Sequence, residues 1–262
     1  MSLTVENLSF SYGKHPVLHE LSFTAQAGEL LAILGPNGVG KTTLFKCVMG
    51  QARRYEGRIL ADGADLSALS PRARAHRVAA IPQAHPLSFR YSAFDMVLMG
   101  TSHGLSPFAA PGERERGLAR DAMERVNISQ LADRPFDHLS GGEQQLVFIA
   151  RALAQQAKIL LMDEPTASLD YGNRLHVLSV ARDLAKDGYT ILLSTHDPQH
   201  ALWFADRALA LQEGRMLALG GPREVLTPAL LEALYGRRIE LVETEQGPVR
   251  SEECRVGKEC RL

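Results

Sequence analysis

A short apolar run, followed at once by a glycine-rich turn and a helical stretch, constrains this fold most strongly. The run Leu30–Leu34 is wholly apolar and ends at Gly35. Its length fits a strand that is buried on both faces better than it fits a helix. A helical stretch is predicted from Lys41 to about Met49, where Gly50 ends it. This order of elements favours a parallel sheet whose strands alternate with helices.

The turn between this strand and helix, Gly35–Thr42, fits the phosphate-binding pattern G-x-x-x-x-G-K-[ST]. Glycines let backbone N–H groups converge on phosphate oxygens, and the helix N-terminus adds positive potential. Lys41 can reach the β- and γ-phosphates, and the Thr42 hydroxyl suits Mg²⁺, which keeps few protein ligands. We therefore expect a nucleotide to bind here, and the candidate binding residues are Gly35, Pro36, Asn37, Gly38, Val39, Gly40, Lys41, Thr42 and Thr43.

A second apolar strand, Ile159–Met162, ends in two acidic residues, Asp163 and Glu164. In an open α/β sheet, the carboxyl ends of the strands face the ligand crevice. Asp163 is therefore placed to hold Mg²⁺. Glu164 is placed to orient or deprotonate an attacking water, a role that phosphoryl transfer requires of some residue.

The segment Leu139–Glu143, which we call the signature segment, precedes an apolar helical pattern. Ser140 and Glu143 have the S-x-x-E spacing of a capping box. Capping does not account for Gly141 and Gly142, because each glycine in a helix costs up to about 1 kcal/mol against alanine. Bare backbone at a helix N-terminus lets an anion approach. We therefore expect a second phosphate contact here, shared between two copies of the chain.

Other patterns set the organisation of the chain. Apolar strands are expected at 78–81 and 190–194, and an early hairpin at 3–10 and 18–23, with its turn at 13–16. From about 84 to 154 helical patterns replace strands, which indicates a helical insertion. We expect one domain over 2–238 and a C-terminal tail over 239–262, without pattern from Pro248 onward.

Composition limits the classes of function. Lys plus Arg number 29 and Asp plus Glu 30, a net charge of −1. Binding along a nucleic-acid backbone usually needs a basic excess, so no nucleic-acid partner is expected. The three cysteines, Cys47, Cys254 and Cys260, fit a reducing compartment. No signal segment opens the chain, and no apolar run approaches the ~18 residues of a membrane span.

The three motifs stand in the order of the ATP-hydrolysing subunit of ABC transporters, which this sequence resembles from about residue 2 to 235. Leu139–Gly142 is that family's own signature. The resemblance implies an α/β fold: a P-loop NTPase (RecA-like) parallel sheet core with an N-terminal antiparallel β subdomain and the helical subdomain as an insertion. It implies ATP hydrolysis with Mg²⁺ bound by Thr42, Gln83 and Asp163.

The resemblance also implies roles for single residues. Gln83 is similar to the family's Q-loop glutamine, which contacts Mg²⁺ and the attacking water. His196 resembles the switch histidine that bonds the γ-phosphate, and Tyr12 the aromatic residue that stacks on adenine. Ser168–Asp170 resembles the loop that crosses the dimer interface. The expected catalytic residues are Glu164, His196, Gln83 and Lys41.

The family's assembly implies the partners. Two copies are expected to pair head to tail, so that each ATP lies between one phosphate loop and the partner's Ser140, Gly141 and Gly142. Transport requires permease subunits in the membrane and, indirectly, a periplasmic or extracellular substrate-binding protein. The protein is then expected at the cytoplasmic face of the cell membrane.

The stretch Tyr91–Gly100 is similar to the ATPases of bacterial importers for iron-siderophore complexes, haem, cobalamin and related metal chelates. In that group a groove near the Q-loop receives a short helix of the membrane subunit. Two alternatives stay open: the ATPase of another ABC transporter class, and a soluble ABC ATPase such as a cluster-assembly factor.

Overall fold

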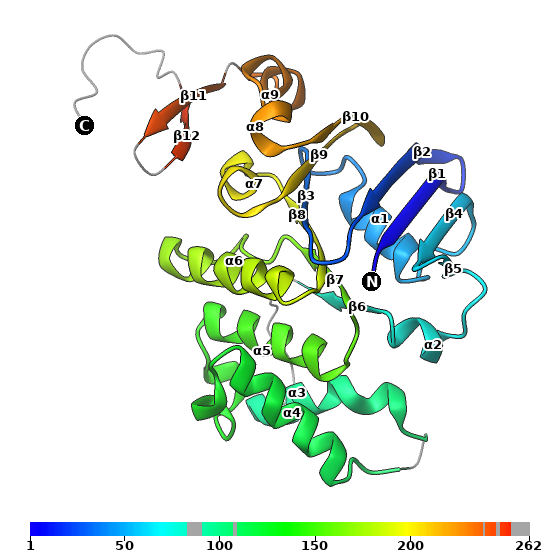
Figure 1. Cartoon of the computed structure of the whole chain (residues 1–262), viewed down its shortest axis with the longest axis vertical. Helices are drawn as coiled ribbons and strands as arrows, with labels where there is room; N and C mark the ends of the chain where they lie inside the picture. Colours follow the sequence, from blue (N-terminus) through cyan, green and yellow to red (C-terminus); the bar gives the residue numbers. More distant parts are fainter. Residues whose placement is uncertain (83–90, 107–108, 238, 245–246, 253–262) are drawn as a thin grey trace.

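A six-stranded sheet forms the centre of the computed structural model, which describes residues 1–82, 91–106, 109–237, 239–244 and 247–252 (Figure 1). Its strand order is β10-β9-β3-β8-β7-β6. All neighbours pair in parallel except β10 and β9. The strands are β3 (Leu30–Leu34), β6 (Val78–Ile81), β7 (Ile159–Asp163), β8 (Thr190–Thr195), β9 (Arg207–Gln212) and β10 (Arg215–Gly220). The predicted parallel core is confirmed.

The central strand β3 is buried on both faces, as its sequence predicts. All of Leu30–Leu34 are 0% exposed. Successive side chains of a strand point to opposite faces. Leu31 and Ile33 pack in the core that contains Leu44 of α1 (Lys41–Val48), while Ala32 and Leu34 pack with Leu231 of α9 (Pro228–Tyr235). The strand therefore holds the start of α1 in a fixed place.

An antiparallel sheet of order β2-β1-β4-β5 packs over α1. Its strands are β1 (Leu3–Tyr12), β2 (His15–Ala25), β4 (Tyr55–Ala61) and β5 (Ala64–Asp65). Tyr12 pairs with His15, so the hairpin turns at Gly13 and Lys14 alone. The longer turn that we expect over 13–16 is wrong, because Gly13 adopts a φ of +61° and closes the turn in two residues.

The described part of the chain between β6 and β7 is mainly helical, and this helical region lies at the bottom of Figure 1. Its helices are α3 (Ala93–Leu98), α4 (Glu113–Arg125), α5 (Gly141–Ala154) and the 3₁₀ turns η1 (Met99–Gly104), η2 (Ser129–Leu131) and η3 (Phe136–His138). Among its described residues, the only strand-like pairing is the isolated bridge between Ser92 and Pro135. A shared core, which includes Ala150 of α5 and Leu178 of α6 (Tyr171–Lys186), joins this region to the sheet.

The remaining elements lie outside the central sheet. They are α2 (Pro71–Ala75), α7 (Pro198–Phe204), α8 (Pro222–Val225) and the hairpin of β11 (Ile239–Thr244) with β12 (Gly247–Glu252). The hairpin differs from the patternless end that we expect from Pro248, since β12 continues to Glu252. No helix within the described ranges combines the length and apolar character that crossing a membrane demands.

Candidate functional site

The phosphate loop turns sharply between β3 and α1 because its glycines adopt backbone angles that other residues avoid. Gly38 and Gly40 have φ values of +85° and +109°. A Cβ at Gly35 would lie 2.3 Å from the carbonyl oxygen of Leu211, so the loop also needs glycine to pack against β9. The predicted strand, loop and helix therefore occur in the expected order, with Lys41 as the first residue of α1.

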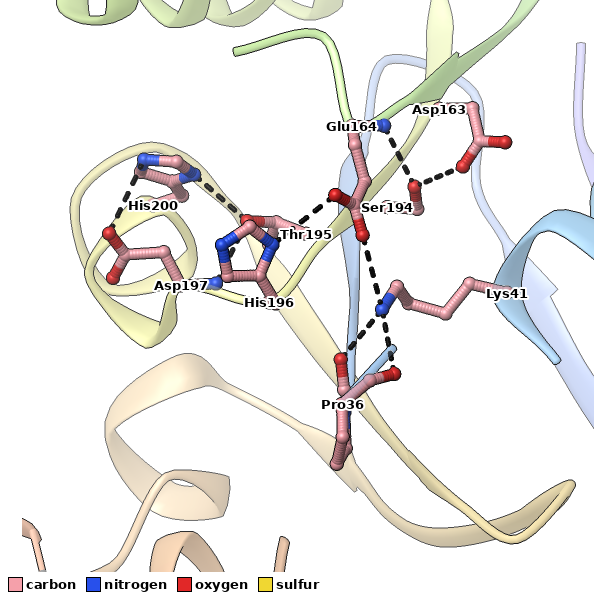
Figure 2. Close-up of polar contacts among 10 residues, drawn as sticks. Pro36, Lys41, Asp163, Glu164, Ser194, Thr195, His196, Asp197 and His200 are labelled. Atoms are coloured by element: carbon pink, nitrogen blue, oxygen red, sulfur yellow. Dashed lines mark hydrogen bonds and ion pairs between the residues drawn. The ribbon is translucent and has the colours of Figure 1, made fainter. Parts of the chain in front are cut away.

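Lys41 folds back over its own loop. Its Nζ donates hydrogen bonds to the carbonyl oxygens of Gly35, at 2.7 Å, and of Pro36, at 3.0 Å (Figure 2). The side chain is 5% exposed. Burial lowers the pKa of Lys41, and the nearby carboxylates of Glu164 and Asp163 oppose that shift. The ammonium group thus lies against the backbone carbonyls of the phosphate loop, close to both predicted acids.

The two acids lie at the carboxyl end of β7, next to the end of β8. Ser194 of β8 is fully buried and joins them. Its hydroxyl donates to Asp163 Oδ1 at 2.6 Å and accepts from the Glu164 backbone N–H at 2.9 Å. Glu164 has a φ of +45°, an uncommon angle for a non-glycine residue, which this backbone bond helps to hold. The hydroxyl therefore fixes how both carboxylates emerge from the strand.

Glu164 lies between Lys41 and His196, two of the other predicted catalytic residues, as Figure 2 shows. Its Oε1 is 3.4 Å from Lys41 Nζ, and its Oε2 is 3.3 Å from His196 Nδ1. His196 is half exposed. Three residues from three separate parts of the sequence are thus brought together by the parallel order of β3, β8 and β7.

A buried residue, His200, contacts the turn that carries His196. His200 Nδ1 lies 2.9 Å from Thr195 Oγ1, and the same oxygen accepts from the Asp197 backbone N–H at 3.1 Å. These contacts link the end of β8 to the start of α7 on both sides of His196. Nothing in the sequence pattern singles out His200, Thr195 or Ser194. The role of Ser194 also depends on which strands are neighbours.

A cavity of about 330 Å³ opens beside this group of residues. Thr42, Asp163 and Glu164 line it, together with Pro82, which follows β6. A hydroxyl and carboxylates are the hard oxygen donors that Mg²⁺ prefers. The donor set of the cavity therefore fits that ion. Gln83, the remaining predicted metal ligand, falls outside the described residues.

The signature segment forms the predicted capping box. Ser140 Oγ accepts from the Glu143 backbone N–H at 3.3 Å, and Glu143 Oε2 accepts from the Ser140 backbone N–H at 2.8 Å. The two glycines differ. A Cβ at Gly142 would lie 2.4 Å from Asn173 Oδ1 of α6, whereas Gly141 is exposed. A Cβ at Gly141 would lie 3.1 Å from Leu169 Cδ2, so the packing there is tight but less so than at Gly142. Packing within the chain thus explains Gly142, where we expect an approaching anion, more fully than it explains Gly141.

The structure does not bring the signature segment to the phosphate loop of the same chain. Among described residues, none of Ser140, Gly141 and Gly142 lines the cavity beside Thr42. Tyr12 stands at the end of β1, 48% exposed, with its ring edge-on to Phe10 at 4.8 Å between centroids. Both features present surface that a ligand or a second chain can reach.

A glycine loop that leads from a buried strand into a helix, with two acids at the carboxyl end of another parallel strand of the same sheet, defines a P-loop nucleotide-binding ATPase. The comparisons give the family. The family model described as "ABC transporter" matches residues 18–167. The chain belongs to the ABC transporter ATP-binding family, and it binds ATP.

Similar proteins match nearly the whole chain. An uncharacterized ABC transporter ATP-binding protein of Haemophilus influenzae is 38% identical, over 92% of each chain. The hemin import ATP-binding protein HmuV of Jannaschia is 39% identical, over 91% of this chain and 89% of its own. An inward-facing structure of a metal-chelate type ABC transporter matches with a TM-score of 0.83 and 33% identity, over 95% of both chains.

These findings confirm the predicted fold, the ATPase activity of a transporter subunit and the resemblance to the metal-chelate importer group. ATPase subunits of this kind dimerise and work with transmembrane permeases.

Proposed function

We propose that this chain drives the import of a metal chelate, such as an iron-siderophore complex, haem or cobalamin, by hydrolysing ATP at the cytoplasmic face of the cell membrane. One observation carries the proposal. Proteins named for hemin import, and a transporter of metal-chelate type, match this chain over nearly its full length. The domain division belongs to the same proposal: an ATPase domain over 2–238, with the helical insertion at about 84–154, and a tail from 239.

The site residues take separate roles in this proposal. Tyr12 stacks on adenine, while the phosphate loop and Lys41 hold the phosphates. Thr42 and Asp163 hold Mg²⁺ with Gln83, and the ion supplies charge neutralisation for the phosphate oxygens when bound. Glu164 orients and deprotonates the attacking water. His196 donates a hydrogen bond to the γ-phosphate, and its 3.3 Å contact with Glu164 Oε2 keeps it beside the reacting group.

The second half of each site comes from a second copy in a head-to-tail pair. Two features support this arrangement. Ser140 and Gly141 are exposed at the N-terminus of α5, where backbone N–H groups favour an anion. They do not line the cavity beside Thr42 in their own chain, in the part that the structure describes. ATP then bridges the two chains, and hydrolysis removes the shared contacts, which shifts the pair toward an open state.

The permease subunit docks in a groove of the helical region. A hollow of about 660 Å³ is lined mainly by apolar residues of α3, η1 and the segment after η1, and Tyr91 and Asp95 also line it. Its lining includes Leu98, Met99 and Leu105. An amphipathic helix that lays its apolar face into such a groove is a recurrent recognition mode. The groove therefore fits a short helix of a membrane protein.

Purified chain and its permease, reconstituted together in proteoliposomes with a substrate-binding protein, test the proposal. We expect ATP-dependent uptake of haem, an iron-siderophore complex or cobalamin, each supplied separately. ATP hydrolysis without uptake of any of these metal chelates would contradict the proposed class of cargo. Co-purification with a soluble assembly complex, and not with a many-helix membrane protein, would contradict the transport function itself.

A matched pair of variants tests the groove. Leu105→Asp places a charge in the groove, whereas Leu217→Asp places one on β10, where Leu217 is 44% exposed. We expect Leu105→Asp to lose permease binding and uptake while the isolated chain hydrolyses ATP normally. Leu217→Asp should leave both unchanged. Equal loss of binding in both variants would remove the groove from its role.

A further inference from the structure

Gln145 of α5 makes a contact that crosses between two parts of the molecule. It is 1% exposed, and its Nε2 donates a hydrogen bond to the carbonyl oxygen of Pro82 at 3.2 Å. A carbonyl can only accept, so the contact requires the amide NH₂ of Gln145 to face Pro82. Gln145, a buried and uncharged polar residue, is therefore bonded to a backbone atom outside the helical region.

Both ends of this contact adjoin the predicted nucleotide machinery. Pro82 directly follows β6 and lines the cavity with Thr42 and Asp163. Gln145 lies less than one helical turn after Gly142, in the helix that begins with the signature segment. One hydrogen bond thus connects the helix that a second chain is proposed to engage with the wall of the cavity that fits Mg²⁺.

Neighbouring glutamines make similar bonds elsewhere and show what is special about Gln145. Gln155, at the other end of α5, donates to the carbonyl oxygens of Ala75 at 2.6 Å and Val78 at 3.0 Å. Gln155 therefore ties the same helix to the start of the same strand β6. Gln144 donates to Phe136 and Leu139, both at 3.1 Å, and stays within the helical region.

We propose that Gln145 is a positioning residue for ATP hydrolysis, which transmits the placement of the signature helix to the cavity wall at Pro82. When α5 shifts as a rigid unit, the bond carries that shift to the backbone beside Thr42 and Asp163. Gln155 anchors the far end of the helix and takes no part in this coupling. The inference rests on the ATPase activity of the family and is independent of which cargo is transported.

Gln145→Met tests the bond, because methionine matches the length of glutamine and lacks the donor. We expect kcat to fall about tenfold, which corresponds to about 1.4 kcal/mol, within the cost of leaving one buried acceptor unpaired. The Mg²⁺ concentration for half-maximal activity should rise, while ATP affinity in the absence of turnover should stay within about twofold, a difference too small to count as a lost hydrogen bond.

Gln155→Met is the matched control. It removes the amide donor that bonds the same helix to Ala75 and to Val78, the first residue of β6, neither of which lines the cavity. We expect it to lower the melting temperature, with kcat and the Mg²⁺ dependence unchanged. Equal losses of kcat in Gln145→Met and Gln155→Met, or wild-type kcat and Mg²⁺ dependence in Gln145→Met, would overturn the proposal.

A second variant guards against misfolding of the first. Gln145→Asn keeps the amide but shortens the side chain by one methylene, so its NH₂ is drawn away from Pro82. We expect this variant to fold, with kcat between those of the wild type and Gln145→Met and the same rise in Mg²⁺ requirement. Wild-type kcat and Mg²⁺ dependence in Gln145→Asn would contradict the role of the bond. The unchanged chain, measured first, establishes the ATPase activity itself.

Discussion

Lys41 Nζ lies 3.4 Å from Glu164 Oε1, so the residue proposed to bind the γ-phosphate forms an ion pair with the residue proposed to act on water. The pair is partly buried, where charges interact more strongly than in water. A triphosphate that accepts hydrogen bonds from Lys41 competes with Glu164 for the same ammonium group. Nucleotide binding is therefore expected to release the carboxylate toward the attacking water.

Replacing Glu164 by glutamine should separate binding from hydrolysis. Glu164→Gln keeps the shape and hydrogen-bonding oxygen of the side chain but loses the base. We expect kcat to fall by about 100-fold or more, since positioned bases contribute 10²–10⁴-fold. ATP binding should persist, and the ATP-bound pair of chains should become long-lived because hydrolysis no longer opens it. Phosphate release and analytical ultracentrifugation with ATP measure the two effects.

The same assays on Glu232→Gln provide the control, because Glu232 is exposed on α9. It should behave as the wild type in both. Normal turnover in Glu164→Gln would remove Glu164 from its proposed role.

Ser194 should matter although it touches neither nucleotide nor water in the proposed mechanism. Ser194→Ala removes the hydroxyl that donates to Asp163 and accepts from the Glu164 backbone. Loss of such a supporting hydrogen bond at a metal site typically costs about 10- to 100-fold in metal affinity or activity. We expect a higher Mg²⁺ requirement and a lower kcat, both measured by steady-state ATPase assays over a Mg²⁺ titration.

Thr190→Val is the matched control for this variant. Thr190 begins the same strand and is fully buried, and its single hydroxyl proton is shared between the carbonyl oxygens of Met1 and Gln26, at the opposite end of the strand from Ser194. Its loss should lower stability without changing the Mg²⁺ requirement. The same Mg²⁺ shift in both variants would show that Ser194 acts only through the stability of the strand.

Ser140 is expected to combine two functions that a second serine can separate. Ser140 and Ser92 both cap helices of the helical region through capping boxes. Replacing either by alanine should cost about 1 kcal/mol of stability, the usual cost of losing an N-cap. Only Ser140→Ala should also weaken ATP-driven pairing of two chains, which light scattering with a non-hydrolysable ATP analogue detects. Ser140→Arg should block pairing altogether while each chain still binds ATP.

Equal pairing in Ser140→Ala, Ser92→Ala and the wild type would contradict a shared site at the signature segment. That result would leave the proposed permease groove and the proposed class of cargo untouched.

The parts of this fold that rest on local pattern could be predicted from the sequence. Leu30–Leu34 is apolar throughout because both of its faces are covered, and Ser140 with Glu143 carries its own capping geometry. Helix α6 starts at Tyr171, four residues before its first aliphatic residue, Leu175, because Asp170 caps it by accepting from the Asn173 backbone N–H at 2.8 Å. Asp170 is polar, so the periodicity of apolar residues gives no sign of this cap.

The contacts that depend on strand order could not be predicted in the same way. Ser194 meets Asp163 only because β8 and β7 are neighbours, in a register that pairs these two residues. The contact between Gly142 and Asn173 likewise depends on how α5 packs against α6. A single sequence gives the residues at the ends of strands but not which ends lie together, so these supporting residues were missed.

The capping box of α5 should also make stability depend on pH. Hydrogen bonds from the backbone N–H and hydroxyl of Ser140 lower the pKa of Glu143 below its usual value of 4.5. A carboxyl group whose pKa is lower in the folded than in the unfolded state stabilises the fold fully above the unfolded value. That stabilisation is lost as pH falls through the folded pKa, because the unfolded chain then binds the proton more readily.

We expect Glu143→Gln, which cannot titrate, to lose less thermal stability than the wild type between pH 5 and pH 3, in scans by circular dichroism. Asp170, whose pKa the Asn173 backbone N–H also lowers, titrates in both proteins, so their difference isolates Glu143. Parallel melting curves for the two proteins over this range would mean that the Glu143 carboxylate contributes nothing to the cap.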